Sequence, residues 1–369
     1  MRIAVLPGDG IGKDVTEASL PVFDKLKLPI ELYFGDLGWE FWKKEGTPVP
    51  ERTWQLINEC DTVLVGAVTS KPQEKAEQEL DKELQNSGLK YVSPVIQLRQ
   101  RLNLFANIRP IQSIYRDESQ DFPKFDFIVV RENTEGLYAG LDFYPIPETL
   151  YEFVQKQHSI QHTWQMKKPE DGAISCRLVT RDGLCRLLQY SYELAQKKGI
   201  KKITWADKPN VMRSSGQFVL DLIKEIGKYY PNIECEVKNV DAVAMWMVKK
   251  PEQFEMIVCE NQFGDILSDL GAGIMGGLGL AASANIGKNK SYFEPVHGSA
   301  PKYEGKNIVN PSAMFLTISM MLEHMGYLDE ANRIKKAVFE VINLKECVTK
   351  DLNGTATTID MAKSIIERC

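Results

Sequence analysis

Apolar residues follow two alternating patterns along the amino-terminal part of the chain. Residues 2–7 (RIAVLP), 30–36 (IELYFGD) and 62–68 (TVLVGAV) are short runs rich in branched and aromatic side chains, which is typical of β-strands. Residues 14–26 and 51–59 lie between these runs and show a helical pattern. Strands that alternate with helices indicate a parallel sheet covered by helices.

The same rhythm returns in residues 178–207, which predicts a second α/β unit. Asp182 is the predicted N-cap of its helix, and Gly199 is the predicted stop. One face of this helix is expected to be apolar, formed by Leu184, Leu187, Leu188 and Ala195. No linker or repeat separates the two units, so the pattern alone predicts an α/β protein without locating a boundary.

Two stretches depart from this rhythm. Residues 140–172 contain prolines and several aromatic residues, and residues 71–90 are strongly charged and fit no predicted element. His158 and His162 have the spacing of a zinc-binding helix pair. They lack a supporting acid, and the segment QHSIQHTW fits a strand equally well. We therefore expect no metal site there.

Composition narrows the class of protein. The formal net charge is −5, which argues against nucleic acid or an anionic membrane as the principal partner. The seven cysteines include no CxxC pair and fit reduced thiols better than a disulfide framework. The chain opens on a strand pattern and has no apolar run of membrane length. We expect a cytoplasmic protein.

The glycines after the first strand resemble a dinucleotide-binding loop at first sight. Gly8, Gly10 and Gly12 follow residues 2–7, but the third glycine comes two positions after the second, where the Rossmann fingerprint needs three. Asp9 would also repel a pyrophosphate. The sequence therefore predicts a tight turn between a strand and a helix, without the classical fingerprint.

Asp265 and Asp269, in the segment NQFGDILSDLGAG, are candidates for metal binding. On a helix, residues four apart share one face, and like charges at that spacing repel each other. A cation between the two carboxylates would relieve the repulsion, and hard oxygen ligands favour Mg²⁺ or Mn²⁺. The alternative is that Asp265 caps the helix and Asp269 is only solvated.

Seven segments in fixed order decide between these interpretations. They are LPGDGIGKDVTEA, LRQRLNLFANIRP, VRENTEGLYAG, ADKPNVMRSSGQF, NVDAVAMW, NQFGDILSDLGAGIMGGLGL and EPVHGSAPKYEGKNIVNP. Together they resemble the β-decarboxylating dehydrogenases, the family of isocitrate, 3-isopropylmalate and homoisocitrate dehydrogenases. The resemblance implies a two-domain α/β fold with the active site between the domains. Residues 1–104 and 276–369 would form the large, coenzyme-binding domain, and residues 105–275 the small domain of a homodimer, with residues 140–172 as an arm exchanged between subunits.

The resemblance also implies roles for individual residues. Substrate carboxylates would be bound by Ser93, Arg99, Arg109 and Arg131, whereas the neighbouring Arg101 is expected to be structural. Asp265 and Asp269 would hold Mg²⁺ or Mn²⁺ together with Asp241 of the other subunit. Lys208, also from the other subunit, would assist deprotonation of the C2 hydroxyl, and Tyr138 would protonate the enol carbon after decarboxylation.

Coenzyme contacts are implied at Thr69, Asn210, His297, Gly298, Lys302, Tyr303 and Asn310. NAD-dependent relatives usually place an aspartate where this chain has Lys302, and NADP-dependent isocitrate dehydrogenases place Lys then Tyr. A cation there suits a 2′-phosphate, so the sequence favours NADP. The downstream segment VTKDLNG lacks the tyrosine and arginine that help to hold the phosphate, which leaves NAD open.

Ser93, which lies six residues before Arg99, and the segments NVMR and RENTE resemble isocitrate dehydrogenases, and this resemblance favours isocitrate as the substrate. Val95 replaces the usual asparagine of isocitrate dehydrogenases, and with Ile96 it offers an apolar wall that suits 3-isopropylmalate. Homoisocitrate stays open as well.

Two other classes of protein compete with an active enzyme. One is a noncatalytic regulatory subunit, which the complete set of catalytic residues disfavours. The other is a nucleic-acid-binding module, for which a basic aromatic surface is missing.

Overall fold

The computed structural model of the chain describes residues 1–114, 124–157 and 165–369. Within them a ten-stranded sheet has the order β2-β1-β3-β12-β11-β4-β5-β10-β8-β9. Its strands are β1 (Arg2–Gly8), β2 (Glu31–Phe34), β3 (Thr62–Ala67), β4 (Ala106–Gln112), β5 (Asp126–Glu132), β8 (Lys202–Asp207), β9 (Glu234–Asn239), β10 (Met256–Cys259), β11 (Ala282–Ile286) and β12 (Ser291–Pro295). The predicted α/β class is confirmed, and the three amino-terminal strand patterns correspond to β1, β2 and β3.

The sheet is parallel at both ends and antiparallel in its centre. β2, β1, β3 and β12 pair in parallel, as do β5, β10, β8 and β9. β4 is antiparallel to β5 and β11, and β11 is antiparallel to β12. The expectation of a parallel sheet is therefore wrong for the centre, because the direction of pairing between β4 and β11 depends on contacts that are distant in sequence.

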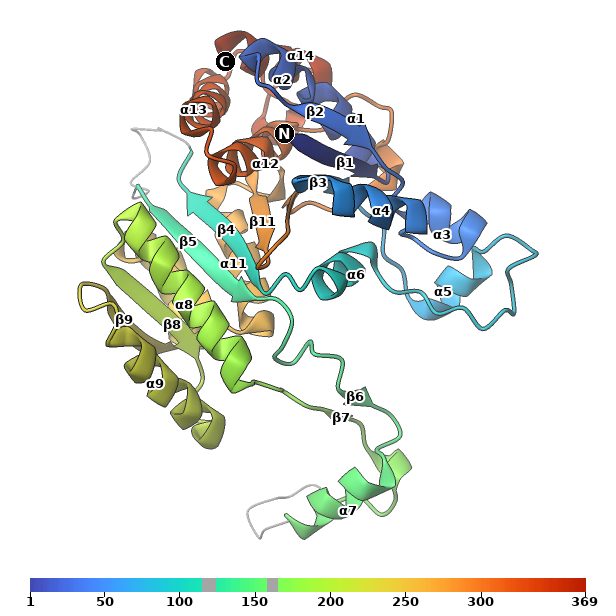
Figure 1. Cartoon of the computed structure of the whole chain (residues 1–369), viewed down its shortest axis with the longest axis vertical. Coiled ribbons are helices and arrows are strands. Elements are labelled where there is room, and N and C mark those ends of the chain that lie inside the picture. The colour runs from blue at the N-terminus through green and yellow to red at the C-terminus, as the bar shows by residue number, and fades with distance from the viewer. Residues whose placement is uncertain (115–123, 158–164) are drawn as a thin grey trace.

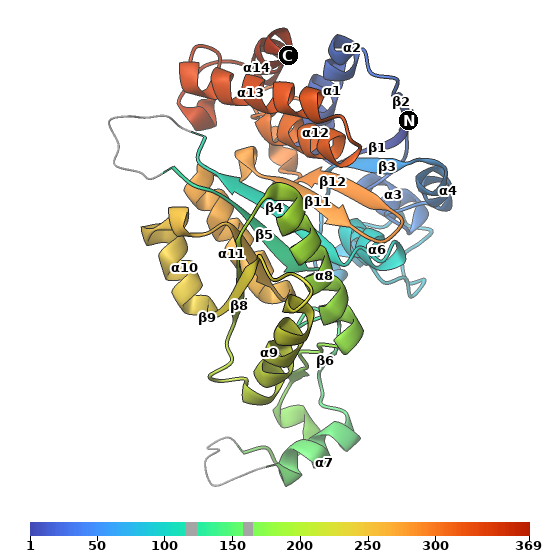
Figure 2. The ribbon, with the colours of Figure 1, turned by 60° about the vertical axis from the view of Figure 1, so that its left-hand side comes forward.

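Helices cover both faces of the sheet (Figures 1 and 2). They are α1 (Ile11–Ser19), α2 (Pro21–Leu26), α3 (Trp39–Glu45), α4 (Glu51–Glu59), α5 (Gln73–Gln78), α6 (Pro94–Arg101), α7 (Glu148–Lys156), α8 (Arg181–Lys198), α9 (Arg213–Gly227), α10 (Val240–Lys249), α11 (Asn261–Met275), α12 (Ser312–His324), α13 (Leu328–Leu344) and α14 (Thr358–Arg368). At the antiparallel centre, α11 packs on β4 and β5, and α12 packs on β11 and β12.

Elements from both ends of the chain lie together in the upper part of Figure 1, where α1 contacts α12 and α14. The predicted division into residues 105–275 and the remainder would fall between β4 and β11 in the strand order. Hydrogen bonding is continuous across that point. The two-domain division therefore stays a prediction.

Two sequence predictions about helices need correction. The amphipathic stretch 14–26 forms two helices, α1 and α2, because Pro21 begins a new helix at its first turn. The N-cap of α8 is Thr180, whose hydroxyl accepts a hydrogen bond from the Gly183 amide, and Asp182 lies inside the first turn. Gly199 ends α8 in a left-handed conformation, as predicted.

The glycine-rich turn after β1 is a packing feature, as predicted. Gly8 has φ +75°, and a Cβ atom there would lie 2.2 Å from the carbonyl oxygen of Ala67. Between the glycines, Asp9 is buried and its carboxylate accepts hydrogen bonds from the backbone amides of Trp39 and Thr69, both at 2.7 Å. Asp9 therefore connects the end of β1 to the start of α3 and to the loop after β3.

The charged residues 71–90 cover a small aromatic cluster. α5 and the loop after it place Ala76 and Leu80 against Trp39 and Trp42 of α3. Tyr91 packs edge-on against both tryptophan rings, and its hydroxyl donates to the Thr69 carbonyl. Residues 71–90 therefore pack against α3, close to Thr69.

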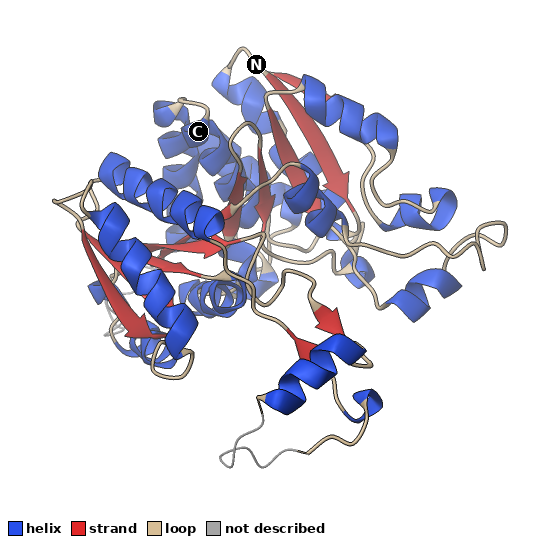
Figure 3. Cartoon of the chain, turned by 60° about the horizontal axis from the view of Figure 1, so that its bottom comes forward, coloured by secondary structure: helices blue, strands red, loops and turns tan. Residues whose placement is uncertain are grey.

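Residues 140–157 and 165–172, the described parts of the stretch 140–172, project away from the ten-stranded sheet (Figures 1 and 3). β6 (Asp142–Phe143) of this stretch pairs with β7 (Ile174–Ser175), which follows the stretch, and α7 lies farther out. His158 and His162 lie outside the described residues, so the expectation about a metal site there stays a prediction.

All seven cysteines are free. Among the described residues, helices of the length and hydrophobicity needed for membrane crossing are absent.

Candidate active site

The antiparallel centre of the sheet carries a row of polar side chains on one face. Alternate residues of a strand point to the same side, and the inward polar positions are Asn107 and Arg109 on β4, Arg131 on β5, Ser283 and Asn285 on β11, and Tyr292 and Glu294 on β12. The intervening Phe293 faces the other side, where its ring contacts His324 of α12. The sheet thus offers a polar face beside α11 and an apolar face beside α12.

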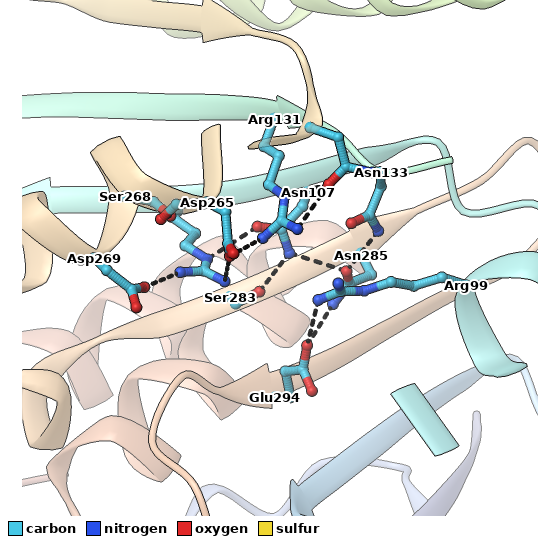
Figure 4. Close-up of polar contacts among 12 residues, drawn as sticks. Arg99, Asn107, Arg131, Asn133, Asp265, Ser268, Asp269, Ser283, Asn285 and Glu294 are labelled. Carbon is cyan, nitrogen blue, oxygen red and sulfur yellow. Dashed lines mark hydrogen bonds and ion pairs between the residues drawn. The ribbon is translucent and has the colours of Figure 1, made fainter. Parts of the chain in front are cut away.

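Arg109 and Arg131 meet the two aspartates of α11. Arg109 Nη1 donates to Asp269 Oδ1 at 2.6 Å, and its Nη2 lies 4.0 Å from Asp265 Oδ1. Arg131 pairs with the same oxygen of Asp265 (Figure 4). It also donates through Nε to Asn261 Oδ1 at 2.9 Å. Gly264 permits this approach, because a Cβ atom there would lie 2.5 Å from the Arg131 Cβ.

Arg99 reaches the same face from the last turn of α6. Its Nη2 lies 3.4 Å from Glu294 Oε1 (Figure 4). The nearby Arg101 points elsewhere, pairing with Glu51 at 3.2 Å and lying over the Trp54 ring at 4.3 Å. The structure therefore brings Arg99, Arg109 and Arg131 together and gives Arg101 a separate packing position.

Positive charge is concentrated in little-exposed side chains. Burial, followed by the like charges of Arg99 and Arg109, lowers the pKa of Arg131 to about 10, while Asp265 opposes this shift. The guanidinium stays cationic at neutral pH. The side chains of Asp265 and Asp269 are 39% and 56% exposed, so the carboxylates lie at the solvent edge of the arginine group.

A cavity of about 180 Å³ opens beside these arginines. Its lining includes Val95, Arg99, Arg109, Glu294 and His297. Ser93, the N-cap of α6, lies two residues before Val95. Burial lowers the pKa of His297, which favours the neutral imidazole, and its buried Nε2 atom has no hydrogen-bond partner among the residues that the structure describes. The cavity thus combines cationic and neutral polar groups with an apolar wall.

Tyr138 lies at the edge of this arrangement, whereas Lys208 lies apart from it. The Tyr138 side chain is largely exposed, and its ring is 6.0 Å from the Arg131 guanidinium carbon. Lys208 follows β8 and donates to Asp241 Oδ1 at 2.6 Å, which lowers the pKa of Asp241. Asn210 follows Lys208 in the loop before α9.

Strand order keeps Lys208 and Asn210 away from the coenzyme segment of the same chain. β8 lies five strands from β12, or roughly 24 Å at about 4.8 Å per strand. Asp241 follows β9, one strand further out. Lys208, Asn210 and Asp241 therefore form a second group at the far end of the sheet.

The carboxylates fit a divalent cation only in part within one chain. Asp265 and Asp269 share a face of α11, as predicted, and hard carboxylate oxygens suit Mg²⁺ or Mn²⁺. The N-cap of α11 is Glu260, so the alternative that Asp265 caps this helix is wrong. In the parts of the chain that the structure describes, no three His, Cys, Asp or Glu side chains come together as a metal site.

Most of the predicted coenzyme residues follow β12, and Thr69, which follows β3, lies beside them. Lys302 and Tyr303 form a short 3₁₀ turn in which the lysine Nζ lies 4.7 Å from the tyrosine ring centre. Thr69 contacts Ser299 through its hydroxyl at 2.7 Å. Gly298 has open space where a side chain would be, which permits close approach of a ligand to the backbone. These features fit a dinucleotide lying along the segment.

Asn310 belongs to the same end of the molecule. Its side-chain amide donates to Asp351 Oδ2 at 3.0 Å, and its carbonyl oxygen accepts from the Ser312 amide. Both halves of the side chain are therefore fixed before any ligand binds.

Several polar residues of the site escaped the sequence analysis. Asn107, Asn285 and Glu294 are buried beneath the arginines. Arg177 lies 3.0 Å from Asp207 and 3.8 Å from Glu260, and Asp207 accepts from the Lys208 amide. The available signal was polar residues at alternate positions in the otherwise apolar strands SANI and YFEP. Such residues face one side of a sheet and need partners when buried.

Comparison with known proteins decides the family. The sequence model of the isocitrate/isopropylmalate dehydrogenase family matches residues 2–366. The chain belongs to this family. The family comprises β-decarboxylating, NAD(P)-dependent dehydrogenases that generally use a divalent metal and are typically homodimers.

Individual members of the family are similar over the whole chain. Protein DlpA of Legionella pneumophila is 54% identical over 100% of this chain, which spans 58% of the length of DlpA. A 3-isopropylmalate dehydrogenase of Methanothermobacter thermautotrophicus is 38% identical over 99% of this chain and 97% of its own length. The crystal structure of isocitrate dehydrogenase from Methylococcus capsulatus has a TM-score of 0.83 and 37% identity, covering 100% of this chain and 98% of that one. The expected isocitrate/isopropylmalate dehydrogenase-like fold is thereby confirmed.

Proposed function

We propose that the protein catalyses the oxidative decarboxylation of isocitrate to 2-oxoglutarate with reduction of NADP or NAD. The observation that carries this proposal is the group of Arg99, Arg109 and Arg131 beside Asp265 and Asp269. Guanidinium groups bind carboxylates with defined orientation. A substrate with several carboxylates therefore fits this face of the sheet better than a neutral metabolite does.

The two groups of residues support a site shared between subunits. Lys208 and Asp241 follow β8 and β9, which lie two and three strands beyond β5, the strand that carries Arg131. Exposed apolar side chains lie beside both groups: Met245 and Val248 share α10 with Asp241, and Ile266 follows Asp265 on α11, which packs against α10. We propose that this surface forms a homodimer interface. The dimer would bring the partner subunit's Lys208 and the partner subunit's Asp241 to Asp265 and Asp269.

The residues of the chain have separable roles in the proposed reaction. The arginines hold the substrate carboxylates, and burial of their side chains limits competition from water. The partner subunit's Lys208 takes the proton from the C2 hydroxyl, and Tyr138 returns a proton to C3 after CO₂ leaves. When bound between Asp265 and Asp269, Mg²⁺ or Mn²⁺ would supply Lewis acidity, and a bound nicotinamide coenzyme would supply the hydride acceptor.

The preferred coenzyme in this proposal is NADP. Lys302 is an exposed cation in the segment beside Gly298, and a charge-assisted contact with a 2′-phosphate would favour NADP over NAD. The downstream segment VTKDLNG, residues 348–354, lacks the tyrosine and arginine that help NADP-dependent relatives to hold the phosphate. We therefore expect a moderate preference.

A specific observation keeps 3-isopropylmalate as a second candidate substrate. Val95 lines the cavity beside Arg99 and Arg109, and a methyl group buried there would gain only about 1–3 kcal/mol in discrimination. The same cavity admits homoisocitrate, which is one methylene longer than isocitrate.

Initial-rate assays test the proposal directly. Purified protein is given isocitrate, 3-isopropylmalate or homoisocitrate with NADP or NAD, in the presence of Mg²⁺ or Mn²⁺. The expected result is the highest kcat/KM for isocitrate with NADP and loss of turnover after chelation. Reduction of neither coenzyme with any of the three acids would contradict the enzymatic proposal and favour the noncatalytic subunit.

A further inference from the structure

A buried chain of hydrogen bonds joins two of the site's arginines beneath the substrate face. Arg109 Nε donates to Asn107 Oδ1 at 3.0 Å, and Asn107 Nδ2 donates to Asn285 Oδ1 at 2.9 Å. Asn285 Nδ2 donates to Glu294 Oε1 at 3.0 Å. Glu294 Oε1 lies 3.4 Å from Arg99 Nη2. The chain runs from β4 across β11 to β12 and ends at α6 (Figure 4).

Strand register places Asn285 at the middle of this chain. Asn285 lies directly opposite Asn107 on β4 and opposite Tyr292 on β12. Its carbonyl oxygen accepts a second hydrogen bond, from Asn133 Nδ2 at 2.9 Å. Tyr292 donates to the same Glu294 oxygen at 2.9 Å. Asn285 is therefore hydrogen-bonded to side chains from β4, from the end of β5 and from β12.

The directions of the hydrogen bonds require a side chain at position 285 that both accepts and donates, as the Asn285 amide does. Asn285 must accept from Asn107 on one side and donate to the Glu294 carboxylate on the other. A carboxylate at this position could accept but not donate, and a hydrocarbon could do neither. Either change would remove a donor to Glu294, and the hydrocarbon would also remove an acceptor for Asn107.

Burial makes each lost partner costly. Asn107 and Asn285 are fully buried, and Glu294 is almost fully buried. A buried polar group without a partner is unfavourable, so the remaining groups would shift to find new partners. Such shifts would pass directly to Arg109, through Asn107, and to Arg99, through Glu294. Both guanidinium groups line the same cavity.

We infer that Asn285 is a positioning residue that fixes the separation and orientation of Arg99 and Arg109, and thereby matches them to the spacing of two substrate carboxylates. Asn285 itself lies beneath the site and does not touch the substrate. The inference rests on the proposed function for the identity of the ligand, but the placement of the two arginines is a property of the chain.

The first test is Asn285→Ala, with Asn343→Ala as its matched control. Asn343 lies on α13 and its amide also donates two hydrogen bonds, to the carbonyls of Ile114 and Phe339. Asn285→Ala should raise KM for the hydroxy acid by about tenfold or more, with KM for the coenzyme unchanged. Asn343→Ala should leave both values unchanged. An unchanged KM for the acid in a folded Asn285→Ala protein would overturn the inference.

The second test is Asn285→Asp, which keeps the shape of the side chain. Burial and the neighbouring Glu294 would raise the pKa of the new carboxyl. When protonated it can donate to Glu294, as the amide does. The ratio of variant to native KM for the acid should therefore fall as pH is lowered from 9 to 6, roughly the range in which such a carboxyl would titrate. A ratio independent of pH would contradict the role of the donor.

Crystal structures of the native protein and both Asn285 variants would show the positions of the Arg99 and Arg109 guanidinium groups without any measurement of turnover. The expected result is displacement of Arg99 or Arg109 in Asn285→Ala with the strands in place. Unmoved guanidinium groups would overturn the inference even if the protein proves active. Displaced groups in a protein that oxidises none of the three acids would uphold it and reject only the proposed function.

Discussion

At the scale of single residues, the site pairs the little-exposed guanidinium groups of Arg109 and Arg131 with the more exposed carboxylates of Asp265 and Asp269. Asp265 pairs with Arg131 and lies 4.0 Å from Arg109, and Asp269 pairs with Arg109. The aspartates therefore have partners in the chain as well as the proposed role at a cation. A substitution there changes both the charge offered to the cation and the compensation of the arginines.

Asp265→Asn should weaken Mn²⁺ binding by more than about tenfold and lower turnover, while the protein stays folded. The physical reason is the loss of an anionic oxygen ligand. Mn²⁺ binding is measured by electron paramagnetic resonance, alongside initial rates. Asp24→Asn, an exposed carboxylate on α2, serves as the control. Full activity of native protein after exhaustive chelation would refute the metal assignment.

Replacement of Lys302 by Asp and Tyr303 by Ile should shift coenzyme use toward NAD. The change exchanges a cation for a carboxylate that repels a 2′-phosphate and accepts from ribose hydroxyls. The value of kcat/KM with NADP should fall by about tenfold or more, with NAD spared. Lys306→Ala is the matched control, because its Nζ lies 5.9 Å from the Tyr303 ring. An equal effect on both coenzymes would place the phosphate elsewhere.

At the scale of elements, helix ends couple the sheet to the site. Thr180 caps α8 and also donates to Glu135 Oε1 at 2.5 Å. Glu135 belongs to the loop between β5 and Tyr138. The start of α8 therefore holds the loop that carries Tyr138, whereas Asp182 faces solvent in the first turn.

Thr180→Ala should lower the free energy of unfolding by about 1–2 kcal/mol, the usual value of a lost N-cap. Asp182→Ala should cost less than about 0.5 kcal/mol, although both residues lie at the start of α8. Urea unfolding of the two variants and the native protein measures the difference. A larger loss for Asp182→Ala would show that the capping role lies there.

The end of α12 should make stability depend on pH. Burial and then Lys197 lower the pKa of His324, whose ring packs on Phe293. Below an unfolded-state pKa of about 6.5, the unfolded chain binds the proton more readily than the folded one. The free energy of unfolding therefore decreases as pH falls through this range. Urea unfolding at pH 7.5 and pH 5.5 should show a smaller decrease for His324→Gln than for the native protein.

At the scale of the whole molecule, the strand order separates two groups of candidate catalytic residues. Arg99, Arg109 and Arg131 belong to the antiparallel centre, whereas Lys208 and Asp241 follow the outer strands β8 and β9. A homodimer that joins the first group of one subunit to the second group of the other would complete two equivalent sites. A monomer would complete neither.

Mixed dimers test this arrangement. Lys208→Met and Asp265→Asn should each be inactive as homodimers. A heterodimer of the two variants would contain one site with both residues intact, so an equal mixture after subunit exchange should recover roughly a quarter of native activity. Native dimer mixed with itself under the same conditions controls for losses. No recovery in verified heterodimers would place both residues in a site within one chain.

The sequence by itself determined much of this protein because its signals are local. Branched apolar runs predicted β1, β2 and β3, and the four-residue spacing predicted that Asp265 and Asp269 share a face of a helix. The seven spaced motifs predicted the family. Each of these features depends on neighbours in the chain, or on motif order, and can be read without knowing which strands pair.

Tertiary structure alone decided what depends on partners distant in sequence. The antiparallel pairing of β4 with β11 places Asn107 opposite Asn285, and no local pattern specifies that register. The same holds for the contact of Thr180 with Glu135, which fixes the cap of α8, and for the packing of residues 71–90 on Trp39 and Trp42. Hydrogen-bond partners of buried polar groups are set by strand pairing and packing, so the chain of contacts beneath the arginines became visible only in the fold.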